Sequence, residues 1–189
     1  MRSSVAVFIL AALVSVSPAA QSQEWRDETG RLSFDATGSI WSIVRPPEEE
    51  ADLIFMLLPT EHLHGNTMEQ VCMVEIGQPI SGRTPSTQLV GNEMTRLAFQ
   101  LEGASGEQQT DDHLLESDGV LSAYNTRDLV DPRDGRVARR ARRIFFLAHD
   151  GAVRMHTFTC IAYASAGEAA AAGLQPTLER LRISAEDAP

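Results

Sequence analysis

The chain contains no lysine, and all 16 of its basic residues are arginine. Acidic residues outnumber them at 26, so the formal net charge is −10 at neutral pH. Because an acidic surface repels nucleic acid and anionic lipid headgroups, the composition argues against both as partners of the whole surface. Absence of lysine together with abundant alanine and arginine is typical of a GC-rich bacterial genome.

The sequence also lacks the motifs that identify common enzyme classes. It has no G-x-S-x-G nucleophile elbow, no H-E-x-x-H zinc motif, no C-x-x-C pair, no P-loop and no dinucleotide fingerprint. Carboxylates are numerous but scattered, so no acid–base pair is identified. We therefore expect a non-catalytic protein without a cofactor that binds a protein partner or a small ligand. The alternative is a hydrolase that uses scattered carboxylates or His156.

One long apolar run is present, Val5–Val16, and it is too short to span a bilayer. Arg2 precedes the run and small residues follow it, which is the pattern of a secretory signal peptide. Cleavage after Ala19 or after Ser22 would leave small residues at the recognition positions. The sequence therefore predicts export to the periplasm or out of the cell, with no membrane span after cleavage.

Loss of residues 1–22 leaves residues 23–189, a length that suits a single compact domain. Loss of Arg2 changes the formal charge from −10 to −11. Hydrophobic residues make up 43% of the chain, which is enough to build a core.

Only two cysteines occur, Cys72 and Cys160, and each lies in a run of residues that favours a strand. In an oxidising compartment such a pair predicts a disulfide, which would close a loop of 88 residues. Two buried free thiols, or a catalytic cysteine paired with His156, are the alternatives.

Periodicity predicts a mixture of strands and helices. We expect strands at Arg31–Phe34, Ile40–Val44 and Gln70–Ile76, a strand at Leu53–Leu58 buried on both faces, and a weak strand at Gly119–Asn125. We also expect a loose N-terminus over residues 23–30 and a polar loop over Gly103–Asp112. The segment Ala166–Ile183 is helix-prone, although Gly173 and Pro176 must break or kink the helix. One further helix is expected from Ser86 or Thr87 to Gly103, with an apolar face formed by Val90, Met94, Leu97, Ala98 and Leu101.

A β-hairpin is predicted over Arg143–Tyr163, with a two-residue turn at Asp150 and Gly151. This turn places His149 opposite Ala152, Phe145 opposite His156 and Ala141 opposite Cys160. The side chains of Phe145, Leu147, His156, Phe158 and Cys160 then share one face of the hairpin, and those of Ile144, Phe146, Met155 and Ile161 share the other. Because both faces carry apolar residues, the sheet is expected to be covered on both sides.

These elements predict an α+β fold, with a largely antiparallel sheet covered by helices and one long C-terminal β-hairpin followed by a C-terminal helix. The order resembles the PsbP-like superfamily, through Leu32–Phe34 before Trp41, the hairpin Arg143–Tyr163 and the closing segment Leu178–Ser184. The resemblance implies a binding or assembly-support role rather than catalysis.

His62 and His64 form the only spacing that suits a metal ion. On an extended segment both imidazoles point to the same side, and Glu61, Met68 and Met73 lie near them in the sequence. The pair is a candidate copper or zinc site. The simpler interpretation is a polar loop, because a structural zinc site needs four ligands and no second pair has matching spacing.

One basic cluster interrupts the acidic sequence, formed by Arg136, Arg139, Arg140, Arg142 and Arg143. Guanidinium groups gathered on one surface would bind an acidic partner, a phosphate or a lipid headgroup. The alternative is that these arginines pair with nearby carboxylates such as Asp128, Asp131 and Asp134.

Overall fold

The computed structural model describes residues 24–46, 52–60, 69–80, 87–103, 111–130, 135–149 and 151–185. The predicted signal peptide, residues 1–22, lies outside these ranges, as do the candidate metal ligands His62 and His64. No helix within these ranges is long and apolar enough to cross a membrane.

The fold is α+β and consists mostly of antiparallel strands. The strands are β1 (Glu24–Arg26), β2 (Leu32–Asp35), β3 (Trp41–Val44), β4 (Leu53–Pro59), β5 (Gln70–Ile80), β6 (Asp111–Ser117), β7 (Val120–Val130), β8 (Val137–His149), β9 (Ala152–Tyr163) and β10 (Leu181–Ile183). Among the described residues, the helices are α1 (Gln88–Gly103), α2 (Glu168–Ala172) and α3 (Leu174–Glu179), and Ala164–Ala166 forms a 3₁₀ turn.

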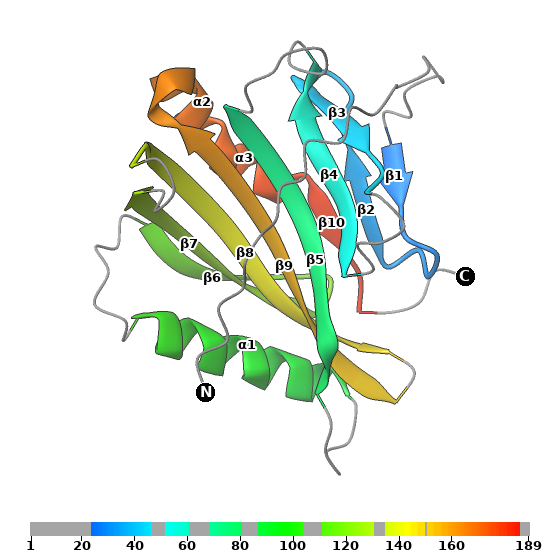
Figure 1. Cartoon of the computed structure of the whole chain (residues 1–189). Helices are drawn as coiled ribbons and strands as arrows, with labels where there is room; N and C mark the ends of the chain where they lie inside the picture. Colours follow the sequence, from blue (N-terminus) through cyan, green and yellow to red (C-terminus); the bar gives the residue numbers. More distant parts are fainter. Residues whose placement is uncertain are drawn as a thin grey trace.

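Two sheets are formed. A seven-stranded sheet has the order β3-β4-β5-β9-β8-β7-β6, and a three-stranded sheet has the order β1-β2-β10. Every pair of neighbouring strands is antiparallel. In Figure 1, α1 crosses the large sheet near one end of its strands, and α2 and α3 lie toward the opposite end, where β9 ends and β5 begins.

The main core lies between the two sheets and is rich in aromatic rings. Phe34 of β2 packs against Phe55 of β4 and Phe158 of β9, with ring centroids 5.8 Å and 5.9 Å apart. Trp25 of β1 also contacts Phe55, at 4.4 Å. The expectation of a loose terminus over residues 23–30 was therefore wrong, because Trp25 gives β1 an apolar contact with the core.

Burial in β4 alternates instead of continuing on both faces. Phe55 and Leu57 are fully buried, whereas Ile54, Met56 and Leu58 are partly exposed. The apolar run therefore did not mean burial on two faces: only the face toward the second sheet is fully covered.

The predicted hairpin corresponds to β8 and β9. His149 lies opposite Ala152, Phe145 opposite His156 and Ala141 opposite Cys160. Gly151 has a φ of +74°, a backbone conformation that favours glycine, and Asp150 lies outside the described residues.

Helix α1 packs on the opposite face of the large sheet, over β7, β8 and part of β9. Val90, Met94 and Ala98 contact the small cluster of Ala123, Ile144, Phe146 and Val153. Leu97 and Leu101 are exposed, so their predicted place on the buried face was wrong. The helix is rotated so that Gly91 faces β8, where an added Cβ would lie 2.8 Å from the Phe146 carbonyl oxygen.

Two segments differ from the sequence prediction. Strand β6 begins at Asp111, within the loop predicted over Gly103–Asp112, and pairs along its length with β7. Strand β7 is longer than the weak strand predicted at Gly119–Asn125. The helix-prone segment Ala166–Ile183 is divided at Gly173 into α2 and α3, as predicted, but Pro176 lies within α3 and the last residues form the strand β10 instead of helix. Leu181 and Ile183 are buried as strand residues because β10 pairs with β2.

Candidate functional site

The two cysteines form a disulfide between adjacent strands in the middle of the large sheet. Cys72 of β5 lies directly opposite Cys160 of β9, and their Sγ atoms are bonded. Both residues are fully buried in the main core. The predicted bridge is therefore present, and neither sulfur is available as a nucleophile.

The arginines predicted as one basic cluster are divided between the two faces of β8. Arg139 and Arg143 share the face of Ala141, and Arg140 and Arg142 alternate with them on the other face. Arg136 precedes β8 and places its guanidinium 3.8 Å from the centroid of the Tyr163 ring. These residues therefore do not form a single exposed surface.

Arg143 is a buried structural residue. Its Nη1 donates hydrogen bonds to the carbonyl oxygens of Leu181 at 2.6 Å and Leu178 at 3.3 Å, and its Nε donates to Ser122 Oγ at 3.1 Å. Burial lowers the pKa of this guanidinium, while nearby Tyr124 and Glu179 act in the opposite direction. The side chain satisfies carbonyl groups at the C-terminal end of α3, where a cation is favourable.

Arg139 forms an exposed ion pair with Asp128 on the neighbouring strand β7, with donor–acceptor distances of 2.8 Å and 3.2 Å. The hydrogen bond from Arg139 lowers the pKa of the Asp128 carboxyl. This pair follows the second interpretation of the cluster, in which arginines are neutralised by nearby carboxylates. Asp131 and Asp134 lie outside the described residues.

His156 is buried in the main core and stacks on Phe145, with ring centroids 5.2 Å apart. Burial lowers its pKa from 6.5 to about 4. Its Nδ1 lies 3.2 Å from the Arg154 carbonyl oxygen. A neutral ring in this position is suited to packing rather than to proton transfer.

The metal hypothesis stays a prediction, because His62, His64 and Met68 lie outside the described residues. Within the described parts of the chain, no group of three or more His, Cys, Asp or Glu residues is placed to hold a metal ion.

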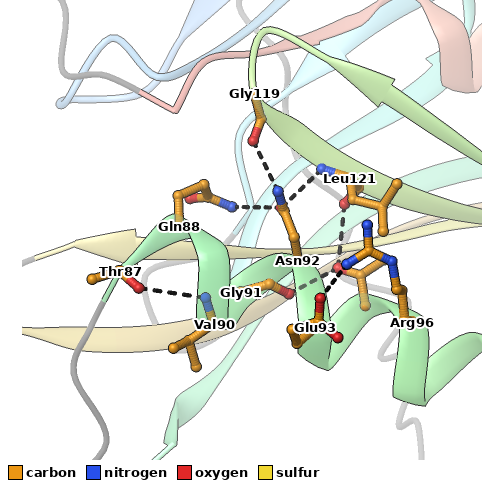
Figure 2. Close-up of polar contacts among 10 residues, drawn as sticks. Thr87, Gln88, Val90, Gly91, Asn92, Glu93, Arg96, Gly119 and Leu121 are labelled. Carbon is orange, nitrogen blue, oxygen red and sulfur yellow. Dashed lines mark hydrogen bonds and ion pairs between the residues drawn. The ribbon is translucent and has the colours of Figure 1, made fainter.

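A row of polar side chains joins α1 to the sheet (Figure 2). Asn92 Nδ2 donates to the Gly119 carbonyl oxygen at 3.1 Å, and Asn92 Oδ1 accepts from the Leu121 amide at 2.9 Å. Gln88 Nε2 donates to the Phe146 carbonyl oxygen at 2.8 Å. Thr95 Oγ1 lies 3.2 Å from the Leu121 carbonyl oxygen. These side chains are used to hold the helix, so the row is an anchor and not a ligand site.

A concave site lies between β3, the start of β5 and the two short helices. We call it the α3 hollow; its volume is about 270 Å³ and its lining residues are Ser39, Ile40, Trp41, Gln70, Ala169, Ala170, Gly173, Pro176, Thr177 and Arg180. One wall is held in place by a hydrogen bond of 2.9 Å from Trp41 Nε1 to Thr177 Oγ1. The space exists because α2 presents alanine side chains to it.

Gln70 places a carboxamide on the wall of this hollow, and within the described residues no hydrogen bond to that carboxamide is found. Only 8% of the residue is exposed, yet neither carboxamide atom is among the buried polar atoms that lack a partner. Gln70 shares the inward face of β5 with Cys72 and Val74, both fully buried. Its donor and acceptor groups are therefore open to the hollow, where water or a ligand can reach them.

Arg180 stands at the rim of the α3 hollow and is fixed there. Its Nη1 donates to the carbonyl oxygens of Asp35 at 3.2 Å and Thr37 at 3.1 Å. Neither Gln70 nor Arg180 was identified from the sequence. For Gln70 a signal existed, since a polar residue occupies the first inward position of a strand whose next inward residues are apolar.

A second hollow, of about 280 Å³, lies on the other side of α2, and we call it the β8 hollow. It is lined by Thr126, Arg139, Ala141, Ala171, Ala172, Leu174 and Gln175. Its one charged side chain, Arg139, is already paired with Asp128. The β8 hollow therefore matches the α3 hollow in size but offers no buried polar group comparable to Gln70.

No protein-family model and no curated protein matches the chain. Among solved structures it is similar to LpqN of Mycobacterium tuberculosis, described as involved in cell envelope biogenesis, with 12% identity, coverage of 81% of this chain and 83% of LpqN, and a TM-score of 0.56. It is also similar to cyanobacterial PsbP from Synechocystis sp. PCC 6803, with 11% identity, coverage of 85% and 91%, and a TM-score of 0.48. The resemblance is structural, and the LpqN match shows a shared fold.

Proposed function

We propose that the protein is exported and acts as a non-catalytic binding module of a bacterial cell envelope, with the α3 hollow as its binding site. The predicted signal peptide supports export to the periplasm or out of the cell. The disulfide of Cys72 and Cys160 also supports it, because such bonds persist in oxidising compartments. LpqN, whose fold is shared, is itself described as involved in cell envelope biogenesis.

The observation that carries the proposal is the Gln70 carboxamide. This carboxamide presents a donor and an acceptor to whatever occupies the hollow. The next inward residues of β5, Cys72 and Val74, are fully buried and apolar. A polar side chain at the end of an otherwise apolar inward face is explained when a bound partner pairs with it.

The chemistry of the two hollows favours binding over catalysis. The described residues that line the α3 hollow and the β8 hollow include no Asp, Glu, His or Cys. Within the described parts of the chain, neither hollow therefore presents a general base or a thiol nucleophile from its wall. The hydrolase alternative would need such a group within hydrogen-bond reach of a substrate.

Two exposed alanines of α2 provide a matched test of the binding site. Ala169 lines the α3 hollow and Ala172 lines the β8 hollow. Ala169→Phe should fill the first and Ala172→Phe the second, each without changing charge. Both variants and the wild type would be immobilised with the disulfide formed and exposed to periplasmic extract of the source bacterium. Captured proteins would be identified by mass spectrometry, and bound small molecules by native mass spectrometry.

We expect the wild type and Ala172→Phe to retain the same ligand and Ala169→Phe to lose it. Equal retention by all three proteins would show that binding occurs elsewhere. No retained protein or small molecule on the wild type would show that the proposed function is wrong.

A further inference from the structure

The α3 hollow combines two kinds of polar recognition with an apolar wall. The Gln70 carboxamide offers an N–H donor and a carbonyl acceptor side by side. The Arg180 guanidinium offers a positive charge at the rim, and Ile40, Ala169 and Pro176 contribute apolar surface. A suitable ligand must therefore carry a donor and an acceptor close together, a negative charge, and a small apolar group.

The hydrogen bonds that hold the Arg180 guanidinium in the fold occupy only one of its three nitrogens, so the other two can bind an anion. Its Nη1 is occupied by two main-chain carbonyl oxygens, those of Asp35 and Thr37. Its Nε and Nη2 donate to no residue in the described parts of the chain. A guanidinium fixed through one nitrogen keeps its other edge for a bidentate carboxylate.

We propose that the α3 hollow binds a peptide, with the Gln70 carboxamide paired to a main-chain amide and Arg180 paired to a nearby carboxylate. This inference rests on the proposed function and names the ligand class for the same site. A peptide unit presents one N–H and one C=O, which is the complement of a carboxamide. A volume of about 270 Å³ lies just below the usual range for small-molecule pockets, so it accommodates a segment of one or two small residues.

The carboxylate has two possible sources, the C-terminus of a chain or an acidic side chain. Three probes distinguish them: N-acetyl-Ala-Ala has a free terminal carboxylate, N-acetyl-Ala-Ala-amide has none, and N-acetyl-Ala-Glu-amide carries it on a side chain. Binding would be followed by two-dimensional NMR of isotopically labelled, disulfide-bonded protein. Affinity for ligands with so few atoms is expected on the order of 1 mM.

We expect at least one carboxylate probe to bind roughly tenfold more tightly than the amide. Shifted amide signals should lie around Gln70, Gly173 and Arg180. Gln70→Leu and Ala169→Phe should each weaken this probe by about tenfold or more, whereas Ala172→Phe should bind as the wild type does. Arg180→Met should remove the difference between the carboxylate probe and the amide, and retain weak binding through Gln70.

Three results would overturn the inference: no binding of any probe by correctly folded wild type, equal binding of acid and amide, or binding unaffected by Gln70→Leu. If these occur while Ala169→Phe still abolishes capture from periplasmic extract, the peptide inference fails alone. If capture also fails, the proposed function fails with it.

Discussion

Loss of the disulfide should cost this protein several kcal/mol of stability, and the amount follows from the loop that the bridge closes. Cys72 and Cys160 are 88 residues apart in the sequence. In the chain-entropy model, a closed loop of that length restricts the unfolded state by about 4.5 kcal/mol at 25 °C. The bridge joins β9, the middle strand of the large sheet, to its neighbour β5. We expect the folded state to change little on reduction, because the two strands are also paired through their backbones.

The comparison is best made on the wild-type chain in its two redox states, because reduction keeps both sulfur atoms in the core. Each cysteine is fully buried, so reductant must be added to the unfolded protein before it is refolded. Urea unfolding followed by tryptophan fluorescence gives the free energy in each state. We expect a loss of about 3–5 kcal/mol in the reduced protein, the upper end being the full entropic figure.

Cys72→Ala/Cys160→Ala serves as the control, since its stability should not respond to reductant. A difference below about 1 kcal/mol between oxidised and reduced wild type would refute the loop-entropy reasoning. Alkylation of both thiols in natively exported protein would show that the bridge itself does not form.

Three further predictions concern buried charge and metal. Burial lowers the pKa of His156 from its ordinary value of 6.5 to about 4, so the unfolded chain takes up this proton at a higher pH than the folded protein does. The free energy of unfolding should therefore be constant above about pH 6.5 and fall by at most about 3 kcal/mol as the pH decreases to 4. In His156→Phe, that part of the curve of unfolding free energy against pH should be flatter. Asp112→Ala should cost about 3–5 kcal/mol in urea unfolding because it removes the carboxylate that is ion-paired with buried Arg127. Glu93→Ala breaks the exposed pair with Arg96 and should cost less than about 1 kcal/mol. Similar losses in the two variants would contradict the burial argument. Elemental analysis of protein purified without chelator should find no stoichiometric copper or zinc. One metal ion per protein molecule in the wild type, absent from the double variant His62→Ala/His64→Ala, would instead establish the metal site.

The sequence predicted the structure best where the alternation of apolar and polar residues in a strand agreed with the residue types of the adjoining turn. The register of β8 and β9 follows from one Asp-Gly turn, because a two-residue loop leaves a single pairing for every later residue. The disulfide follows from cysteine number and export. Both inferences depend on local sequence or on a simple count.

Other features depended on tertiary contacts that no local pattern contains. The buried face of α1 was predicted wrongly because polar side chains help to orient the helix. Gln88, Asn92 and Thr95 form hydrogen bonds to backbone groups of β7, β8 and the turn between β6 and β7. In this orientation Leu97 is exposed. Strand β10 was read as helix because its partner, β2, lies far away in the sequence.

The candidate site was missed for a related reason. Its walls come from β3, β5, α2 and α3, which are not all adjacent in the sequence. Arg180 is held at the rim by hydrogen bonds to the carbonyl oxygens of Asp35 and Thr37, which are distant from it in the sequence. By contrast, the arginine cluster was conspicuous in the sequence, but strand alternation divides it between two faces. Proximity in sequence was a poor guide to a shared surface on a strand.

The most direct test of the α3 hollow as a binding site is the paired effect of Gln70→Leu on stability and on ligand capture. If the carboxamide serves a ligand and not the fold, its removal should change the free energy of unfolding of the unliganded protein by less than about 1 kcal/mol, because within the described residues it makes no hydrogen bond that the substitution could break. The same variant should lose the ligand that the wild type captures from periplasmic extract. A loss of stability with capture unchanged would show that Gln70 is a structural residue and would contradict the proposed site.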